Sequence, residues 1–280
     1  MKSILEDLTP PFLWRTAKRI VSILEKPEWQ YIPEGWEAQK KDSNIKGWNV
    51  ESVLEAYQKT WAGFVENIEG TLPLAISPEW YSRKRDNLIF HNMIMTYGYV
   101  LSFSSRNKSS ISMLDWGGGI GHYYLFSKKL CPDLQINYHC KDLPILAKYG
   151  QTLFPEAHFY SDESCLNQKY DFILASGSLH FSEDWQSTLK ALAEVTQEHL
   201  FITRLPIVYQ VSSYAMIQRA YKYGYDTEYL GWCLNKDEFI RCATNCGLKL
   251  IQEFYNGENP DILNAPESCQ YMGFLFKKIV

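Results

Sequence analysis

The sequence has no long hydrophobic run, no Cys-x-x-Cys pair and no excess of basic residues. None of its apolar stretches approaches the about 18 residues that a membrane-spanning helix needs. The seven cysteines include no Cys-x-x-Cys pair, which is more typical of reduced thiols than of a disulfide framework. A net charge of −4 argues against a nucleic-acid partner, because such proteins normally present a basic surface.

Signals for export and for metal binding are also missing. Residues 1–26 lack the apolar core and small-residue cleavage site of a secretory signal, so we expect a cytoplasmic protein without an integral membrane segment. Cys242 and Cys246 lie one helical turn apart, but no nearby histidine completes a zinc-binding set. No metal site is therefore expected.

Aromatic side chains are plentiful, at 15% of the residues, with nine Trp and nineteen Tyr. Many fall in the segment 208–232, namely Tyr209, Tyr214, Tyr221, Tyr223, Tyr225, Tyr229 and Trp232. A structureless loop of that length is uncommon, so the segment predicts an aromatic lid over a pocket. A plain core role for some of these side chains remains open.

The first part of the chain predicts helices and loops without strands. Helical periodicity runs from Val53 to Phe64 and again over 85–101, whereas 27–47 is polar and predicts a long ordered loop. A polar linker at 106–110 suggests a boundary between a helical N-terminal domain (1–106), acting as a cap or in homodimerisation, and a second domain (107–280). The basic residues Arg15, Lys18 and Arg19 beside an apolar stripe suit either a membrane surface or packing on the second domain.

The second domain alternates strand and helix signals, as a doubly wound parallel sheet requires. Strands are expected at Ile111–Asp115, Gln135–Cys140, His158–Tyr160, Tyr170–Ala175 and Leu200–Thr203, and a closing antiparallel pair at Leu248–Phe254 and Gln270–Phe276. Helices are expected up to about Leu130, from Pro144, over Asp184–Val195 and over Lys236–Cys246, which Gly247 ends. The fold class is therefore α/β.

The first of these strands runs into the segment Asp115-Trp116-Gly117-Gly118-Gly119-Ile120-Gly121. Glycines between a strand and a helix let backbone N–H groups approach a ligand closely. The dinucleotide fingerprint G-x-G-x-x-G does not fit, because His122 or Tyr124 falls on its last glycine. The pattern D-x-G-x-G-x-G instead resembles the first motif of the class I S-adenosylmethionine (SAM)-dependent methyltransferases.

This resemblance implies a Rossmann-like sheet of seven strands and a set of cofactor-binding residues: Asp115, Gly117, Gly119, Asp142, Asp162 and Ser176. Asp142 follows the second strand, where a carboxylate can accept hydrogen bonds from a ribose diol, and Asp142-Leu143-Pro144 resembles small-molecule O-methyltransferases. Asp142 also suits a cap for the helix that begins at Pro144. Asp162 follows the third strand, where the family contacts adenine.

His180 is the candidate catalytic base, because a histidine at the rim of such a sheet can remove a proton from an acceptor hydroxyl. Leu179-His180 resembles the L-H-D-W segment of plant-type O-methyltransferases, although Phe181 replaces the aspartate. A packing role is the alternative. Arg204, after the fifth strand, suits either an acceptor carboxylate or phosphate, or a surface ion pair. His91 is a further candidate base, with packing as its alternative.

More narrowly, the chain resembles bacterial methyltransferases that are often found near surface-polysaccharide genes. The matching residues include Gly35-Trp36-Glu37-Ala38, Gly47-Trp48, Ala175-Ser176-Gly177 and Arg204-Leu205-Pro206. We expect a SAM-dependent methyltransferase that acts on a small-molecule acceptor, with O-methylation by a histidine base. The alternatives are N-methylation and a SAM-binding regulatory or interaction protein without catalysis.

Overall fold

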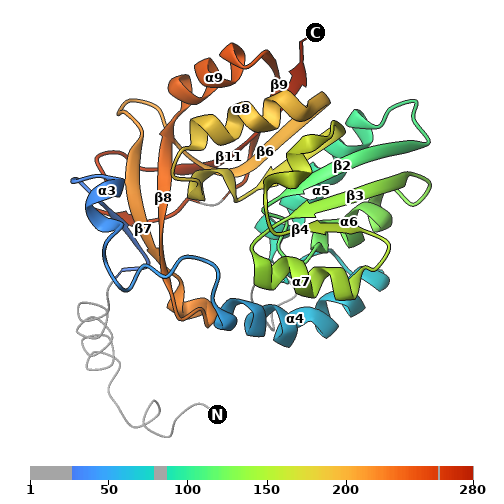
Figure 1. The fold of residues 1–280 in the computed structure, drawn as a ribbon, viewed down its shortest axis with the longest axis horizontal. Coiled ribbons are helices and arrows are strands. Elements are labelled where there is room, and N and C mark those ends of the chain that lie inside the picture. Colours follow the sequence, from blue (N-terminus) through green and yellow to red (C-terminus); the bar gives the residue numbers. More distant parts are fainter. Residues whose placement is uncertain (1–26, 79–86, 258, 280) are drawn as a thin grey trace, which may run out of the picture.

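The computed structural model describes residues 27–78, 87–257 and 259–279 and has an α/β architecture (Figure 1). The predicted N-terminal helix with Arg15, Lys18 and Arg19 lies outside these residues. The central strands are β2 (Ser110–Trp116), β3 (Gln135–Lys141), β4 (His158–Tyr160), β5 (Tyr170–Ser176), β6 (Thr196–Val208), β9 (Leu248–Tyr255) and β11 (Gln270–Lys278).

The central strands follow the order β4-β3-β2-β5-β6-β11-β9. The first five are parallel to one another, whereas β11 is antiparallel to both β6 and β9. This confirms the predicted parallel sheet with a closing antiparallel pair. Chain order reverses between β2 and β5, and such a switch point is where open α/β sheets bind ligands.

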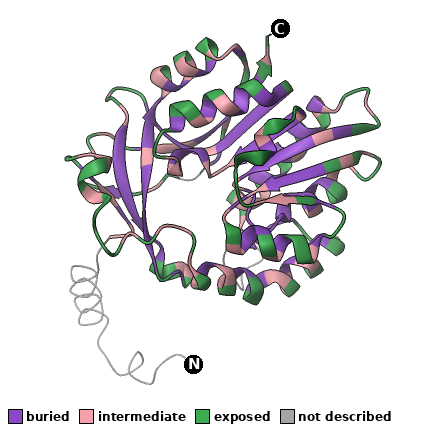
Figure 2. Ribbon diagram, in the orientation of Figure 1, coloured by how far each residue is buried: buried purple, intermediate pink, exposed green. Residues whose placement is uncertain are grey.

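Helices cover both faces of the sheet. Helices α4 (Glu51–Glu69), α5 (Leu88–Ser104) and α6 (His122–Leu130) share one buried cluster with it. Helices α8 (Trp185–Val195) and α9 (Lys236–Asn245) share a second cluster on the opposite face, and α7 (Pro144–Leu153) packs beside β4. Figure 2 shows the central strands largely buried and the outer helices buried on one side only.

Short polar side chains mark several helix starts, as the sequence chemistry demands. The Asp184 carboxylate accepts a hydrogen bond from the Ser187 N–H at the start of α8, at 3.0 Å. Asn235 accepts one from the Glu238 N–H at the start of α9, at 3.1 Å. Each bond satisfies a backbone donor that has no partner within the helix.

The sheet is larger than predicted, with eleven strands within the described ranges. The additional strands are β1 (Trp29–Tyr31), β7 (Tyr214–Arg219), β8 (Glu228–Asn235) and β10 (Ile262–Leu263), in the order β10-β1-β7-β8-β6. The expectations of a strand-free N-terminal part and of an all-loop segment 27–47 were therefore wrong. Segment 208–232 also contains strand β7 and the first part of β8, and every residue of β7 is buried.

The N-terminal helices are packed into the same core as the sheet. Phe64 of α4 and Ile94 of α5 are fully buried, in one cluster with Met113 of β2. The short helix α3 (Trp36–Gln39) contacts β8 through Trp36, whose ring stacks on Trp232 at 5.4 Å. The predicted boundary at residue 106 between an N-terminal and a second domain stays a prediction. Among the helices that the structure describes, none is long and apolar enough to cross a membrane.

Candidate active site

The glycine loop between β2 and α6 lies at the switch point of the sheet. Gly117, Gly119 and Gly121 have φ angles of 71°, 61° and 88°, which L-residues with side chains rarely adopt. A Cβ on Gly117 would lie 2.3 Å from the Cβ of Ser178, which follows β5. The Ser178 hydroxyl also donates to the Trp116 carbonyl at 2.6 Å. The loops after β2 and β5 are thus in direct contact.

Asp115 lies beneath this loop and is fully buried. One carboxylate oxygen accepts a hydrogen bond from the Tyr138 hydroxyl of β3, and the other has no partner among the described residues. A Cβ on Gly118 would lie 2.4 Å from the Asp115 carboxyl carbon. The structure therefore places Asp115 under the loop backbone, where it supports the loop from below.

Burial raises the pKa of Asp115 to about 7, against the lowering effect of the Tyr138 hydrogen bond and with a further rise from the charge of Asp142. An unfolded aspartate ionises near pH 4, so between roughly pH 4 and 7 the folded state binds more protons. The stability that the protonated group contributes is therefore lost as the pH rises through about 7.

Replacing Asp115 with Asn should remove this pH dependence, because the amide does not titrate. We expect the free energy of unfolding of the wild type to fall by about 3 kcal/mol more than that of Asp115→Asn between about pH 5 and pH 8. Urea unfolding at the two pH values measures it, with the exposed Asp133→Asn as the matched control. Equal pH dependence in wild type and Asp115→Asn would contradict the assignment.

Asp142, after β3, is joined to the glycine loop. Its carboxylate accepts hydrogen bonds from the Gly119 N–H at 2.7 Å and from the Leu143 N–H at 2.6 Å. The alternative of a helix cap was wrong, because Leu143 occupies the cap position of α7 and no side chain caps that helix. The two backbone donors therefore fix the Asp142 carboxylate beside the loop.

The other predicted cofactor residues lie at the ends of neighbouring strands. Asp162 is exposed and accepts hydrogen bonds from the backbone and hydroxyl of Ser164, which lower its pKa. Ser176 ends β5, and its hydroxyl lies 2.9 Å from the hydroxyl of Tyr123. The carboxyl ends of β2, β3, β4 and β5 thus carry the whole predicted set.

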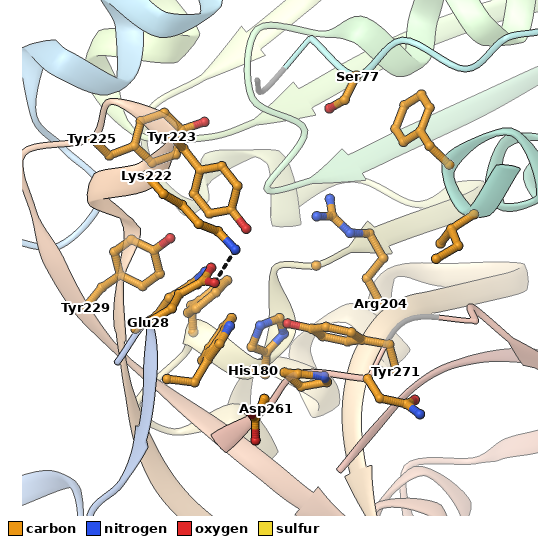
Figure 3. Close-up of a pocket in the computed structure, with 18 of the residues that line it drawn as sticks. Glu28, Ser77, His180, Arg204, Lys222, Tyr223, Tyr225, Tyr229, Asp261 and Tyr271 are labelled. Carbon is orange, nitrogen blue, oxygen red and sulfur yellow. Dashed lines mark hydrogen bonds and ion pairs between the residues drawn. The ribbon is translucent and has the colours of Figure 1, made fainter. Parts of the chain in front are cut away.

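A cavity of about 600 Å³ opens beside the loop that follows β5 (Figure 3). Its lining includes Gly177 and His180 from that loop, Arg204 from β6, Tyr271 from β11 and several aromatic residues. In Figure 3 Arg204 and Lys222 extend into the cavity from opposite sides, and His180 lies between them. The two predicted catalytic residues therefore share one cavity.

His180 is 2% exposed, and neither ring nitrogen has a hydrogen-bond partner among the described residues. Burial, together with the charge of Arg204, lowers its pKa to about 3, so the imidazole is neutral at ordinary pH. Arg204 has a φ of 53°, unusual for a side-chain-bearing residue inside a strand. Its guanidinium lies 3.4–3.5 Å from the position of a Cβ on Gly177.

The opposite wall of the cavity is aromatic. The Trp48 ring stacks on Tyr229 at 4.0 Å, and Phe181 meets both rings edge to face at 5.1 Å. Beside them, Lys222 and Glu28 form an ion pair across the junction of β7 and β1. Sequence reasoning placed Tyr229 in a lid but missed Trp48 as a wall residue. The Gly47-Trp48 pair was the available signal.

Two candidates lie elsewhere. His91 is on α5, where Phe90 and Met93 line the cavity but His91 does not. Cys242 lies on α9 and Cys246 directly follows that helix, at a groove between α8 and α9. Within the described ranges, no group of three or more His, Cys, Asp and Glu side chains is arranged to hold a metal ion.

Comparison with solved structures finds SAM-dependent methyltransferases of similar fold. One from Clostridium acetobutylicum is 12% identical, with 67% of this chain and 92% of that chain covered and a TM-score of 0.47. The magnesium protoporphyrin IX methyltransferase of Synechocystis PCC 6803, with bound SAM, is 11% identical, with 80% and 94% covered and a TM-score of 0.45. The mitomycin 7-O-methyltransferase MmcR is 13% identical, with 81% and 68% covered and a TM-score of 0.44. No family model and no curated protein matches the sequence.

Proposed function

We propose that this protein is a SAM-dependent methyltransferase that acts on a small-molecule acceptor. The observation that carries the proposal is the glycine loop at the switch point, with three glycines at positive φ and the Asp142 carboxylate bonded to the Gly119 N–H. Open α/β sheets bind nucleotide-like ligands at this point. The register of the glycines argues against a dinucleotide.

The residues at the carboxyl ends of β2, β3, β4 and β5 suit the chemical groups of SAM. The loop backbone from Gly117 to Gly119 is kept free of side chains, because a Cβ at either position would collide with Ser178 or Tyr57. The fixed carboxylate of Asp142 suits the ribose diol, and Asp162 with Ser176 lies at the adjacent strand ends. When bound, SAM supplies a methyl group that its sulfonium already activates.

The cavity beside Gly177 suits the acceptor, since its volume of about 600 Å³ lies within the range of small-molecule sites. His180 and Arg204 lie at the end of the cavity nearest the cofactor-binding edge, because Gly177 and Ser178 connect the two. We assign O-methylation, with His180 accepting the proton of the acceptor hydroxyl. N-methylation is the second candidate, and a SAM-binding protein without catalysis the third.

Cofactor binding is testable with S-adenosylhomocysteine (SAH), the product of methyl transfer. We expect micromolar binding by calorimetry, and about 10–100-fold weaker binding for Asp142→Asn, because hydrogen bonds to a charged group are worth about 1.5–3 kcal/mol. Asp133→Asn, at an exposed turn, should bind SAH like the wild type.

Two results would count against the cofactor assignment. One is tight binding of NAD⁺ in place of SAH. The other is an unchanged SAH affinity in an Asp142→Asn variant whose thermal unfolding matches that of the wild type.

A further inference from the structure

We propose that the acceptor is a planar aromatic molecule that presents an acidic hydroxyl, of the phenol class, to Arg204 and His180. This inference rests on the proposed function and names its acceptor. It separates an aromatic hydroxyl from the aliphatic hydroxyl of a sugar.

The first support is the shape and chemistry of the walls. Trp48, Phe181 and Tyr229 form a mutually packed aromatic group on one side of the cavity, and Tyr271 lies on the other side, next to His180 (Figure 3). Flat aromatic surfaces favour a flat partner, because offset and edge-to-face ring contacts add to the burial of apolar area.

The second support is a set of buried polar atoms that a ligand would satisfy. Both ring nitrogens of His180 and the indole Nε1 of Trp48 are buried without a partner among the described residues. Buried polar atoms in native proteins are nearly always hydrogen-bonded. Trp48 and His180 both line the one cavity, so a rigid ring with polar atoms at two points would suit this pair of residues.

The third support is the charge at the reacting end. Arg204 is close enough to His180 for its charge to help lower the pKa of the imidazole to about 3, after the larger effect of burial. The same cation favours the ionised form of a hydroxyl bound next to it. His180 is therefore a weak base, which takes a proton readily only from an oxygen that Arg204 and an aromatic ring have made acidic. An aliphatic sugar hydroxyl lacks the ring.

The reaction balances with these two residues. The acceptor oxygen forms a bond to the methyl carbon, and the carbon–sulfur bond breaks with its electron pair left on sulfur. The acceptor proton passes to His180 and then to solvent. Arg204 holds the developing oxyanion through hydrogen bonds from its guanidinium.

4-Nitrophenol tests the proposal without turnover, because its phenolate absorbs visible light and its ionisation can be read directly. With the protein saturated by SAH, we expect the pKa of bound 4-nitrophenol to be lower than in water by about 1–3 pH units, the effect of an opposite charge within a few ångströms. Arg204→Gln should abolish the decrease and Arg204→Lys should retain part of it. Arg241→Gln, on the exposed side of α9, should leave it intact.

Several outcomes would overturn the phenol assignment. One is no binding of 4-nitrophenol at millimolar concentration, and another is a pKa of the bound phenol equal to or above that in water. The others are an equal pKa of the bound phenol in Arg204→Gln and Arg241→Gln, and displacement of 4-nitrophenol by methyl β-glucoside at similar concentration.

SAH affinity is measured on each variant first. Loss of SAH binding in the wild type would count against the proposed function itself, and so the two failures are distinguishable.

Discussion

Replacing Gly117 with alanine is expected to weaken SAH binding by about 100-fold or more. The backbone at Gly117 has a φ of 71°, and holding a side-chain-bearing residue in that region costs about 1–3 kcal/mol. The added Cβ would also lie 2.3 Å from the Cβ of Ser178, a short side chain that cannot swing away. The loop must therefore move away from β5, and the backbone groups that we assign to cofactor binding move with it.

Gly63→Ala provides the matched control. Gly63 lies within α4, and a Cβ there has no heavy atom within 4 Å, so alanine should slightly stabilise the helix and leave SAH binding unchanged. Calorimetry with SAH and circular dichroism on both variants separate lost binding from lost folding. A folded Gly117→Ala protein that binds SAH as the wild type does would refute the placement of the cofactor on this loop.

The seven central strands, all of which follow residue 107, were predictable because their signals are local. Each predicted strand of the central sheet forms, since buried runs such as 111–114 are bounded by turn or helix signals. The terminal strands β9 and β11 are antiparallel, as predicted. Only the lengths differ: β6 extends to Val208 and pairs with β8 beyond the bend at Arg204.

The N-terminal strand and the β7–β8 pair were not predictable in the same way. β1 is a strand of three residues, Trp29–Tyr31, and is held by contacts distant in sequence: Gln30 pairs with Ile217 and the Arg219 guanidinium donates to the Pro27 carbonyl. Its own residues show no alternation long enough to indicate a strand. The aromatic composition of β7 and β8 likewise suits a lid as well as a sheet.

In the candidate site, too, some features were predictable from the sequence and others were not. Residues just past the strands, such as Asp142 and His180, were found because topology brings the carboxyl ends of parallel strands to one edge. The burial of Asp115 beneath the loop depends on Tyr138 of the neighbouring strand, and the placement of Trp48 depends on stacking with Tyr229. Such contacts are set by tertiary packing, which a single sequence does not encode as a local pattern.

Replacing His180 with alanine is expected to lower turnover of phenol by about 10²–10⁴-fold, the usual contribution of a positioned general base. The SAH affinity should be nearly unchanged, because His180 lies in the cavity that we assign to the acceptor. Since the pKa of His180 is about 3, the imidazole is in its neutral form at neutral pH, which is the form that a general base needs, although it is a weak base. His91→Ala, on α5 away from the cavity lining, should retain wild-type turnover.

Comparing two acceptors distinguishes a base from a residue that only positions the ring. Above the pKa of bound 4-nitrophenol the oxygen is already anionic, so no proton has to be removed and His180→Ala should lose much less turnover than it does with phenol at neutral pH. An equal loss with both acceptors would mean that the imidazole orients the substrate without taking its proton. Near-normal turnover of phenol by His180→Ala would mean that methyl transfer depends on the proximity of the two substrates and on Arg204. The Arg204 guanidinium stays protonated in proteins, so it acts only by stabilising the oxyanion.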